Sequence, residues 1–283
     1  ARAALARTED KPYRAAVQAR VTMEIPVSAD DRLQQEIHDL VEFRHRKAGS
    51  STQTLPMTIT VTYILERAGK GLKVEVVEFS DYITPDKALA EGDLDLNSYQ
   101  HAPFLANFNK QNGTKLVPIG NTILMRMGIY SDKIHDLKAI PEGATVAIPN
   151  DPTNGGRGLV LLEKAGLIKL KEGVGFKATV NDVVENPKNL KFKELEAAQL
   201  PRSLADVDLA VITMNYVMSS GMDVKKQGLF WEKDDEPLAV MVLAAREKDK
   251  DKAEYKKIAE IFHSEAVKKF IEEKFKGTIV PAK

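Results

Sequence analysis

The nine residues PNDPTNGGR, residues 149–157, give the clearest indication of how this chain folds and what it binds. They follow TVAI, residues 145–148, a short run rich in β-branched side chains that is typical of a strand, and the Asn-Asp-Pro that comes next is typical of a turn. Thr153 is placed to cap a helix that continues through LVLLEKA to Gly166. The stretch therefore predicts a strand, a turn and the start of a helix.

Such a helix start is suited to binding an anion. Its first turn has unpaired backbone N–H groups and the positive end of the helix dipole. Gly155 and Gly156 would allow a ligand to approach this backbone closely, and Arg157 adds a planar, permanently charged group that matches a carboxylate. We expect a site for a small anion or an amino-acid carboxylate. The alternative is an ordinary turn beside a surface arginine.

The composition excludes several classes of protein. At 283 residues, 43% of them hydrophobic, the chain is long enough for one large domain or two compact lobes with buried cores. The 41 basic and 41 acidic residues balance, so bulk charge gives no indication of a nucleic-acid partner. There is no cysteine, and the histidines show no metal-ligand spacing beyond a weak His38/His45 pair. We expect no metal, no cofactor and no membrane-spanning segment.

From residue 57 onward, strand-like segments alternate with helical ones, which predicts an α/β fold with largely parallel sheets. The predicted strands are 59–63, 74–79, 115–119, 123–130, 145–148, 190–195, 209–213 and 239–244. Helices are predicted at 85–91 and 101–111, and one continuous helix is predicted within 253–276. Residues 1–20 could be a frayed helix or a tail. The short connection between 59–63 and 74–79 cannot hold a parallel crossover. Either these strands are not sequential neighbours, or a helix from elsewhere, such as 31–48, supplies the crossover.

Seven segments stand in order between about residue 72 and the C-terminus. They are VEFSDY (77–82), ALAEGDLD (88–95), NSYQHAPFL (97–105), IGNT (119–122), PNDPTNGGR (149–157), NDVVENPKNL (181–190) and ELEAAQLPRS (194–203). In sequence and spacing this part of the chain resembles the methionine-binding lipoproteins, the solute-binding components of methionine ABC importers. Residues 1–56 lie outside the resemblance.

The resemblance implies an α/β fold of the two-lobed periplasmic-binding-protein kind, type II-like, with the ligand in a cleft between the lobes. Residues 57–125 together with 237–283 would form lobe 1, and residues 126–236 would form lobe 2. Residues 1–56 are unrecognised and could complete lobe 1. The chain would cross between the lobes near 123–130 and 237–244.

The resemblance also implies which residues bind the ligand. Tyr82, Tyr99, His101 and Phe104 match family positions around the ligand side chain, Asn154 and Arg157 match positions facing its carboxylate, and Asn215 matches a segment that helps hold the amino acid. A thioether suits such an aromatic-walled slot, because contacts between sulfur and aromatic rings are favourable. His101 could instead cap the helix that begins near Pro103.

The chain departs from the family at Thr213 and Val240, where asparagines typically help hold the polar end of the ligand. These departures leave the ligand open between L-methionine, D-methionine, a methionine dipeptide and another small amino acid.

The predicted function is that of a solute-binding protein. It would capture methionine, or a close amino-acid or dipeptide relative, by hinge closure and deliver it to the permease and ATPase of an ABC importer, without chemical change. We expect it in the cell envelope, in the periplasm or at the outer face of the cytoplasmic membrane, held by an N-terminal lipid anchor that is absent from this chain. The alternatives are a surface interaction protein with a degenerate cleft and, less favoured, an enzyme on a similar scaffold.

Overall fold

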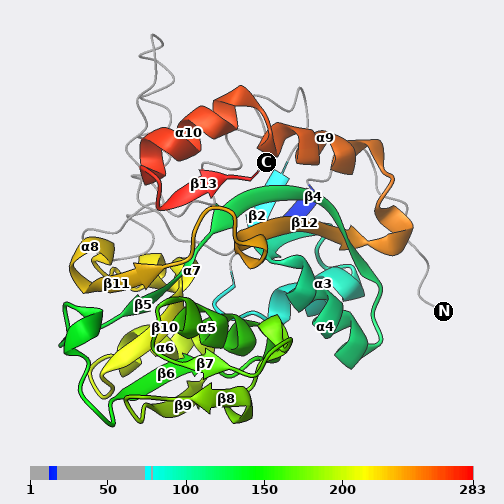
Figure 1. Ribbon diagram of the computed structural model, residues 1–283. Helices are drawn as coiled ribbons and strands as arrows, with labels where there is room; N and C mark the ends of the chain where they lie inside the picture. The colour runs from blue at the N-terminus through cyan, green and yellow to red at the C-terminus, as the bar shows by residue number, and fades with distance from the viewer. Residues whose placement is uncertain (1–12, 18–73, 78, 283) are drawn as a thin grey trace, which may run out of the picture.

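The structure is a computed structural model that describes residues 13–17, 74–77 and 79–282. These residues form two lobes, each built around a central sheet on which helices pack (Figure 1). The α/β, two-lobed fold that was predicted is therefore confirmed.

The first lobe contains a six-stranded sheet in the order β13-β4-β12-β3-β1-β2. Its strands are β1 (Tyr13–Val17), β2 (Val74–Val77), β3 (Leu96–Gln100), β4 (Leu116–Met125), β12 (Val240–Arg246) and β13 (Ile279–Pro281). β1 is parallel to β2 and β3, whereas β12 is antiparallel to β3 and β4, and β13 is antiparallel to β4. Because β4 leads into the second lobe and β12 returns from it, these two neighbours run in opposite directions.

The second lobe contains a five-stranded sheet in the order β11-β5-β10-β6-β9 and a two-stranded sheet of β7 and β8. The strands are β5 (Met127–Tyr130), β6 (Thr145–Pro149), β7 (Lys169–Leu170), β8 (Val183–Glu185), β9 (Lys191–Leu195), β10 (Leu209–Thr213) and β11 (Gly228–Trp231). β6 is parallel to β9 and β10, and β5 is antiparallel to β10 and β11. Both large sheets are thus mixed, and the prediction of largely parallel sheets is wrong for the strands that connect the lobes.

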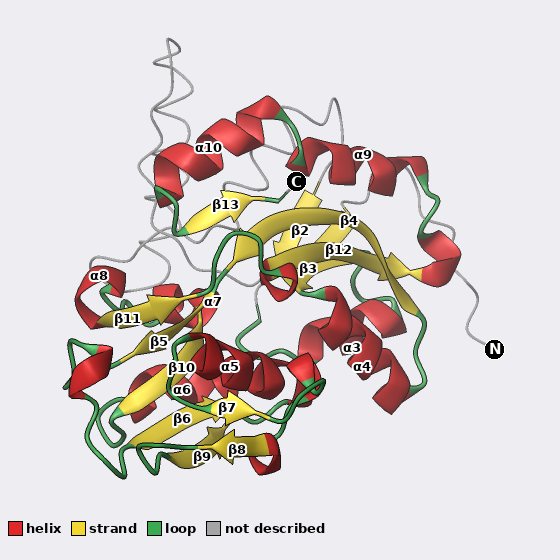
Figure 2. Ribbon diagram, viewed as in Figure 1, coloured by secondary structure: helices red, strands yellow, loops and turns green. Residues whose placement is uncertain are grey.

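Helices cover both faces of the first sheet (Figure 2). They are α3 (Thr84–Glu91), α4 (Ala102–Asn112), α9 (Ala253–Phe262) and α10 (Glu265–Phe275). Along β12, Val242 and Ala244 belong to the apolar cluster of α3 and α4, whereas Met241, Leu243 and Ala245 belong to the cluster of α9 and α10. Successive side chains of a strand point to opposite faces, so β12 is apolar from Val240 to Ala245 because both of its faces are covered.

The second sheet is covered in the same way. Its helices are α5 (Pro152–Lys164), α6 (Leu200–Ser203), α7 (Met214–Ser219) and α8 (Val224–Gln227). Leu159 of α5 packs with Val146 of β6 on one face, while Leu200 of α6 packs with Ala147 of β6 on the other. This packing fixes the N-terminal end of α5 at the edge of the lobe that faces the first lobe.

The chain crosses between the lobes twice. The first crossing is at Arg126, between β4 and β5, and the second is the segment 232–239, between β11 and β12. We propose that the lobes are residues 57–125 with 237–283 and residues 126–236, on the support of the strands that each sheet contains. Of the residues before β2, the structure describes only 13–17, so the place of 1–56 as a whole remains a prediction.

Several local predictions are corrected. Residues 13–17 form a strand beside β2 rather than a frayed helix or tail, while the predicted strand 59–63 and helix 31–48 lie outside the described residues. Residues 116–125 are one strand where two were predicted, and the predicted helix 253–276 is two helices. The second of these begins at Glu265, directly after Ser264, whose hydroxyl accepts a hydrogen bond from Val267 N and so caps α10. None of the helices in the described part of the chain combines the length and hydropathy that a membrane crossing requires.

Candidate functional site

A cavity lies between the two lobes. The space between its lining atoms is about 330 Å³, part of which opens to solvent, and this is near the lower end of the volumes of small-molecule sites. Its lining consists of Tyr82, Tyr99, Gln100, His101, Phe104, Met125, Asn154, Arg157, Thr213, Asn215 and Met241. The structure therefore brings all seven predicted site residues to one cavity, although they come from β3, α4, α5, α7 and the loop before α3.

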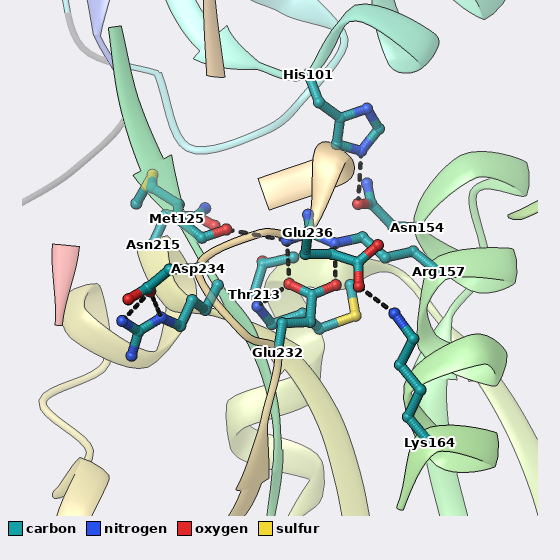
Figure 3. A network of polar contacts seen from close by, with 12 residues as sticks. His101, Met125, Asn154, Arg157, Lys164, Thr213, Asn215, Glu232, Asp234 and Glu236 are labelled. Carbon is teal, nitrogen blue, oxygen red and sulfur yellow. Dashed lines mark hydrogen bonds and ion pairs between the residues drawn. The ribbon is translucent and has the colours of Figure 1, made fainter. Parts of the chain in front are cut away.

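Arg157 lies in the second turn of α5 and is almost fully buried, with 2% of its surface exposed. Its Nε and Nη2 atoms donate to the two carboxylate oxygens of Glu232 at 2.7 and 2.6 Å, and Nη2 also donates to Met125 O at 2.9 Å (Figure 3). Within the described residues, none of the guanidinium's hydrogen bonds involves Nη1. Arg157 also lines the cavity, and Nη1 is the guanidinium nitrogen that keeps free hydrogen-bonding capacity there.

Glu232 is the partner that the sequence analysis missed. It stands in WEKDDE, residues 231–236, which looks like an ordinary solvated charged run. In the structure Glu232 is 5% exposed, and its Oε2 also accepts a hydrogen bond from Met127 N at 2.7 Å. Glu232 is the first residue of the second crossing. It binds both Arg157 and the backbone next to the first crossing, at Met127. The only signal in the sequence is that it directly follows the strand 228–231.

Two of the other three acidic residues of the second crossing, Asp234 and Glu236, are paired as well. Asp234 forms an ion pair with Arg126 of the first crossing, and Glu236 forms one with Lys164 of α5 (Figure 3). Since Arg157 and Lys164 are seven residues apart, they lie on one face of α5, and the segment 232–236 follows that face. These pairs attach the second crossing to the second lobe up to Glu236.

Two side chains, Tyr82 and His101, form hydrogen bonds across the cavity from one lobe to the other. The Tyr82 hydroxyl donates to Asn215 Oδ1 at 2.9 Å and lies 2.8 Å from Thr213 Oγ1. A hydroxyl has one proton, so Thr213 is the donor in the second contact. Burial raises the pKa of Tyr82 well above its ordinary value, so its hydroxyl remains a donor at neutral pH. Asn215 Nδ2 takes part in none of the hydrogen bonds among the described residues and is available to a ligand.

His101 both caps a helix and contacts the opposite lobe, so the two roles that the sequence allowed are compatible. Its Nδ1 accepts a hydrogen bond from Phe104 N at 3.2 Å at the start of α4, and its Nε2 lies 3.1 Å from Asn154 Oδ1. An acceptor at Nδ1 places the proton on Nε2, which then donates to Asn154. Burial, with a smaller contribution from the positive charge of Arg157, lowers the pKa of His101 to about 4. The imidazole is therefore neutral at physiological pH.

The apolar part of the cavity is made of aromatic rings and thioethers. The ring centroid of Tyr82 is 6.1 Å from that of Tyr99 and 5.8 Å from that of Phe104, and the Tyr99 hydroxyl donates to Tyr82 O at 2.7 Å. Met125 and Met241, neither of them predicted, complete the lining. These are adaptable, polarisable surfaces that suit an unbranched apolar or thioether side chain.

A buried polar group lies behind this lining. Asp86 Oδ1 accepts hydrogen bonds from Asn97 Nδ2 at 2.8 Å and from Gln100 Nε2 at 2.6 Å, whereas Asp86 Oδ2 and Gln100 Oε1 have no hydrogen-bond partner in the described structure. Burial raises the pKa of Asp86 to about 6, although both amide contacts oppose the shift.

Two details of the predicted helix start are corrected. Asp151, rather than Thr153, is the cap of α5, because its carboxylate accepts a hydrogen bond from Asn154 N at 2.9 Å. The two glycines face the protein's own backbone. A Cβ on Gly155 would lie 2.8 Å from Pro149 O, and one on Gly156 would lie 2.1 Å from Phe176 O. Their role is close internal packing, and α5 contributes Asn154 and Arg157 to the cavity lining.

The departures at Thr213 and Val240 have different consequences. Thr213 lines the cavity and is bonded to Tyr82, so a hydroxyl there takes part in the contact between the lobes. Val240 is half-buried and is outside the cavity lining. Among the described residues there is also no cluster of His, Asp and Glu that could hold a metal ion. The cavity thus combines one buried arginine with an apolar wall of aromatic rings and thioethers.

A two-lobed α/β fold with a small-molecule cavity between the lobes defines the periplasmic-binding-protein class, and solved structures of that class superpose on this chain. A nutrient binding protein from Burkholderia cenocepacia bound to methionine has a TM-score of 0.77 at 38% identity, covering 96% of this chain and 100% of that one. An ABC transporter periplasmic substrate-binding protein from Coxiella burnetii has a TM-score of 0.77 at 36% identity, covering 95% and 100%.

The chain belongs to the NlpA lipoprotein family, whose model matches residues 50–283. Among curated relatives, the D-methionine-binding lipoprotein MetQ of Escherichia coli O157:H7 is 49% identical over 212 residues, which is 74% of this chain and 78% of that protein. The predicted resemblance is confirmed, and the family is one of solute-binding proteins.

Proposed function

We propose that this protein captures methionine between its lobes and delivers it to an ABC importer. The observation that carries the proposal is the cavity itself, in which a buried arginine with one uncommitted N–H-bearing atom faces a wall of aromatic rings and thioethers. The ligands and roles named for similar proteins agree with that chemistry.

The contacts suggest how methionine is held. Its carboxylate binds Arg157 Nη1 and Asn215 Nδ2, and its thioether lies among Tyr82, Tyr99 and Phe104. His101 and Asn154 form the side of the cavity nearest the start of α5. In such a cavity the few polar groups fix the orientation of the ligand, while apolar contacts supply much of the affinity.

Binding is coupled to closure of the two lobes. The bonds from Tyr82 to Thr213 and Asn215, and from His101 to Asn154, join residues of different lobes, so they form only when the lobes are together. A ligand that contacts both lobes binds the closed form more tightly than the open form, and it stabilises the closed form according to this difference in affinity. The importer then recognises the closed form, and the ligand leaves chemically unchanged.

We place the protein in the cell envelope, lipid-anchored in its full-length form, in line with the lipoprotein names of its family and relatives. Binding and delivery require no catalytic group, so we propose no enzymatic activity.

Mass spectrometry of the small molecules released on denaturing freshly purified protein tests the proposal. Methionine at close to one molecule per chain supports it, and titration of the stripped protein with L- and D-methionine then identifies the enantiomer. A dipeptide or another amino acid keeps the closure mechanism and changes the ligand. The absence of any released ligand, together with no heat on titration with these candidates, contradicts the proposal and favours an interaction protein with a degenerate cleft.

A further inference from the structure

Glu232 lies directly behind the guanidinium that faces the cavity. Two charge-assisted bonds of 2.7 and 2.6 Å join its carboxylate to Arg157, and the Met127 backbone N–H adds a third hydrogen bond at 2.7 Å. Both side chains are nearly inaccessible to solvent, with 2% of each exposed. In such a poorly solvated place a full negative charge beside the arginine cancels most of the field that the arginine would otherwise project into the cavity.

The remaining charges around the cavity are weak by comparison. Among the described residues that line the cavity, Arg157 alone has a permanent charge, and His101 is neutral because burial lowers its pKa to about 4. Asp151 caps α5 from a partly exposed position, where solvent screens its charge. The charge inside the cavity is therefore decided by the pair of Arg157 and Glu232.

We infer that Glu232 sets the charge preference of the cavity, which selects ligands with a carboxylate and no net charge and rejects anions that have the same apolar side chain. This inference rests on the proposed function and identifies the residue behind its selectivity. A buried arginine without a counter-ion would attract carboxylates, sulfate and phosphate alike. With Glu232 behind it, Arg157 still offers Nη1 as a directed donor, but a net negative ligand meets the opposing charge of the glutamate.

A purely structural role for Glu232 predicts a different result. If the carboxylate only orients the guanidinium, its loss weakens every carboxylate ligand by the same factor. If it also sets the charge preference, its loss changes the ratio between a zwitterion and an anion. The ratio of two dissociation constants therefore separates the roles, whatever happens to the absolute affinity.

The experiment uses two ligands that differ in one group. Methionine is a zwitterion, and 4-(methylthio)butanoate is the same molecule without the amino group and has one negative charge. Calorimetric dissociation constants are measured for wild type, E232Q and E236Q. Glu236 is a matched control, because it is also buried and paired with a base of α5 but, in the described structure, forms no hydrogen bond or ion pair with Arg157.

We expect wild type and E236Q to prefer methionine by the same ratio. In E232Q we expect this ratio to shift toward the anion by about tenfold or more, which corresponds to about 1.4 kcal/mol. If E232Q does not fold, E232D provides the test, because its shorter side chain moves the carboxylate away from the guanidinium. A shift in the same direction of about threefold is then expected.

The outcomes distinguish this inference from the proposed function. Wild-type protein that binds neither ligand contradicts the proposed function, and the inference with it. The inference alone is overturned if wild-type protein binds methionine and folded E232Q keeps the wild-type ratio. If E232Q does not fold, the same result for E232D overturns it.

Discussion

Removing the Tyr82 hydroxyl tests how the lobes are held together. The hydroxyl forms two hydrogen bonds to the opposite lobe, one with Asn215 Oδ1 and one with Thr213 Oγ1. A side-chain hydrogen bond contributes about 1 kcal/mol net, so Y82F should destabilise the closed form by about 2 kcal/mol. At about 1.4 kcal/mol per tenfold, the dissociation constant for methionine should rise by about 30-fold.

The assay is calorimetric titration of Y82F and of a control, Y130F. Tyr130 is fully buried and accepts a hydrogen bond from Trp231 Nε1, but both residues lie in the second lobe. Y130F should therefore lower the free energy of unfolding by about 1 kcal/mol and leave the affinity for methionine unchanged. Most of the loss in Y82F should appear as faster dissociation, because the bonds form only after the lobes close. A dissociation constant for Y82F within about threefold of wild type would refute the reasoning.

Four further variants test separate parts of the structure. R157M should abolish methionine binding and lower the free energy of unfolding by about 3 kcal/mol or more, because it leaves Glu232 buried without a counter-ion; a double variant R157M/E232L that regains stability in urea but not binding would separate the two roles. G156A should be strongly destabilised in thermal unfolding, since its Cβ would lie 2.1 Å from a backbone carbonyl oxygen, and wild-type stability would contradict that packing. The pKa of His101 falls from 6.5 to about 4 on folding, so the stability that this residue contributes is present above pH 6.5 and is lost as the pH falls toward 4. In urea unfolding, the free energy of unfolding of H101N should therefore gain about 3 kcal/mol relative to that of wild type between pH 7 and pH 4. The pH dependence for Asp86 is opposite, because its pKa rises from 3.8 to about 6 on folding and the stability that it contributes is lost as the pH rises through 6. The free energy of unfolding of D86N should gain about 3 kcal/mol relative to that of wild type between pH 3.8 and pH 7. A difference from wild type that does not change with pH, in either variant, would contradict these assignments.

Local sequence signals predicted the helices and strands that have their own start and stop residues. α3 and α4 each have a proline in the first turn and end at Gly92 and Gly113, both with positive φ, as the sequence pattern indicates. The strand directions in each sheet could not be predicted in this way. Whether β12 runs parallel or antiparallel to β4 depends on where the chain re-enters the first lobe, and no local pattern encodes that.

The seven site residues were predicted through the family resemblance, and the structure brings them all to one cavity. Their individual contacts were beyond the sequence. Glu232 is 75 residues from Arg157, and a glutamate in an acidic run is normally exposed, so its buried ion pair emerges only from the packing of the second crossing along α5. Gly155 and Gly156 were misassigned because a glycine needed for internal packing looks the same in sequence as one that makes room for a ligand.

A crystal structure of the stripped protein grown with methionine tests the central claim most directly. The account predicts one methionine in the cavity between the lobes, its carboxylate within hydrogen-bond distance of Arg157 Nη1 and its thioether among Tyr82, Tyr99 and Phe104, with Arg157 still bonded to Glu232. A cavity that stays empty at saturating methionine, or a ligand bound with its carboxylate away from Arg157, would contradict it.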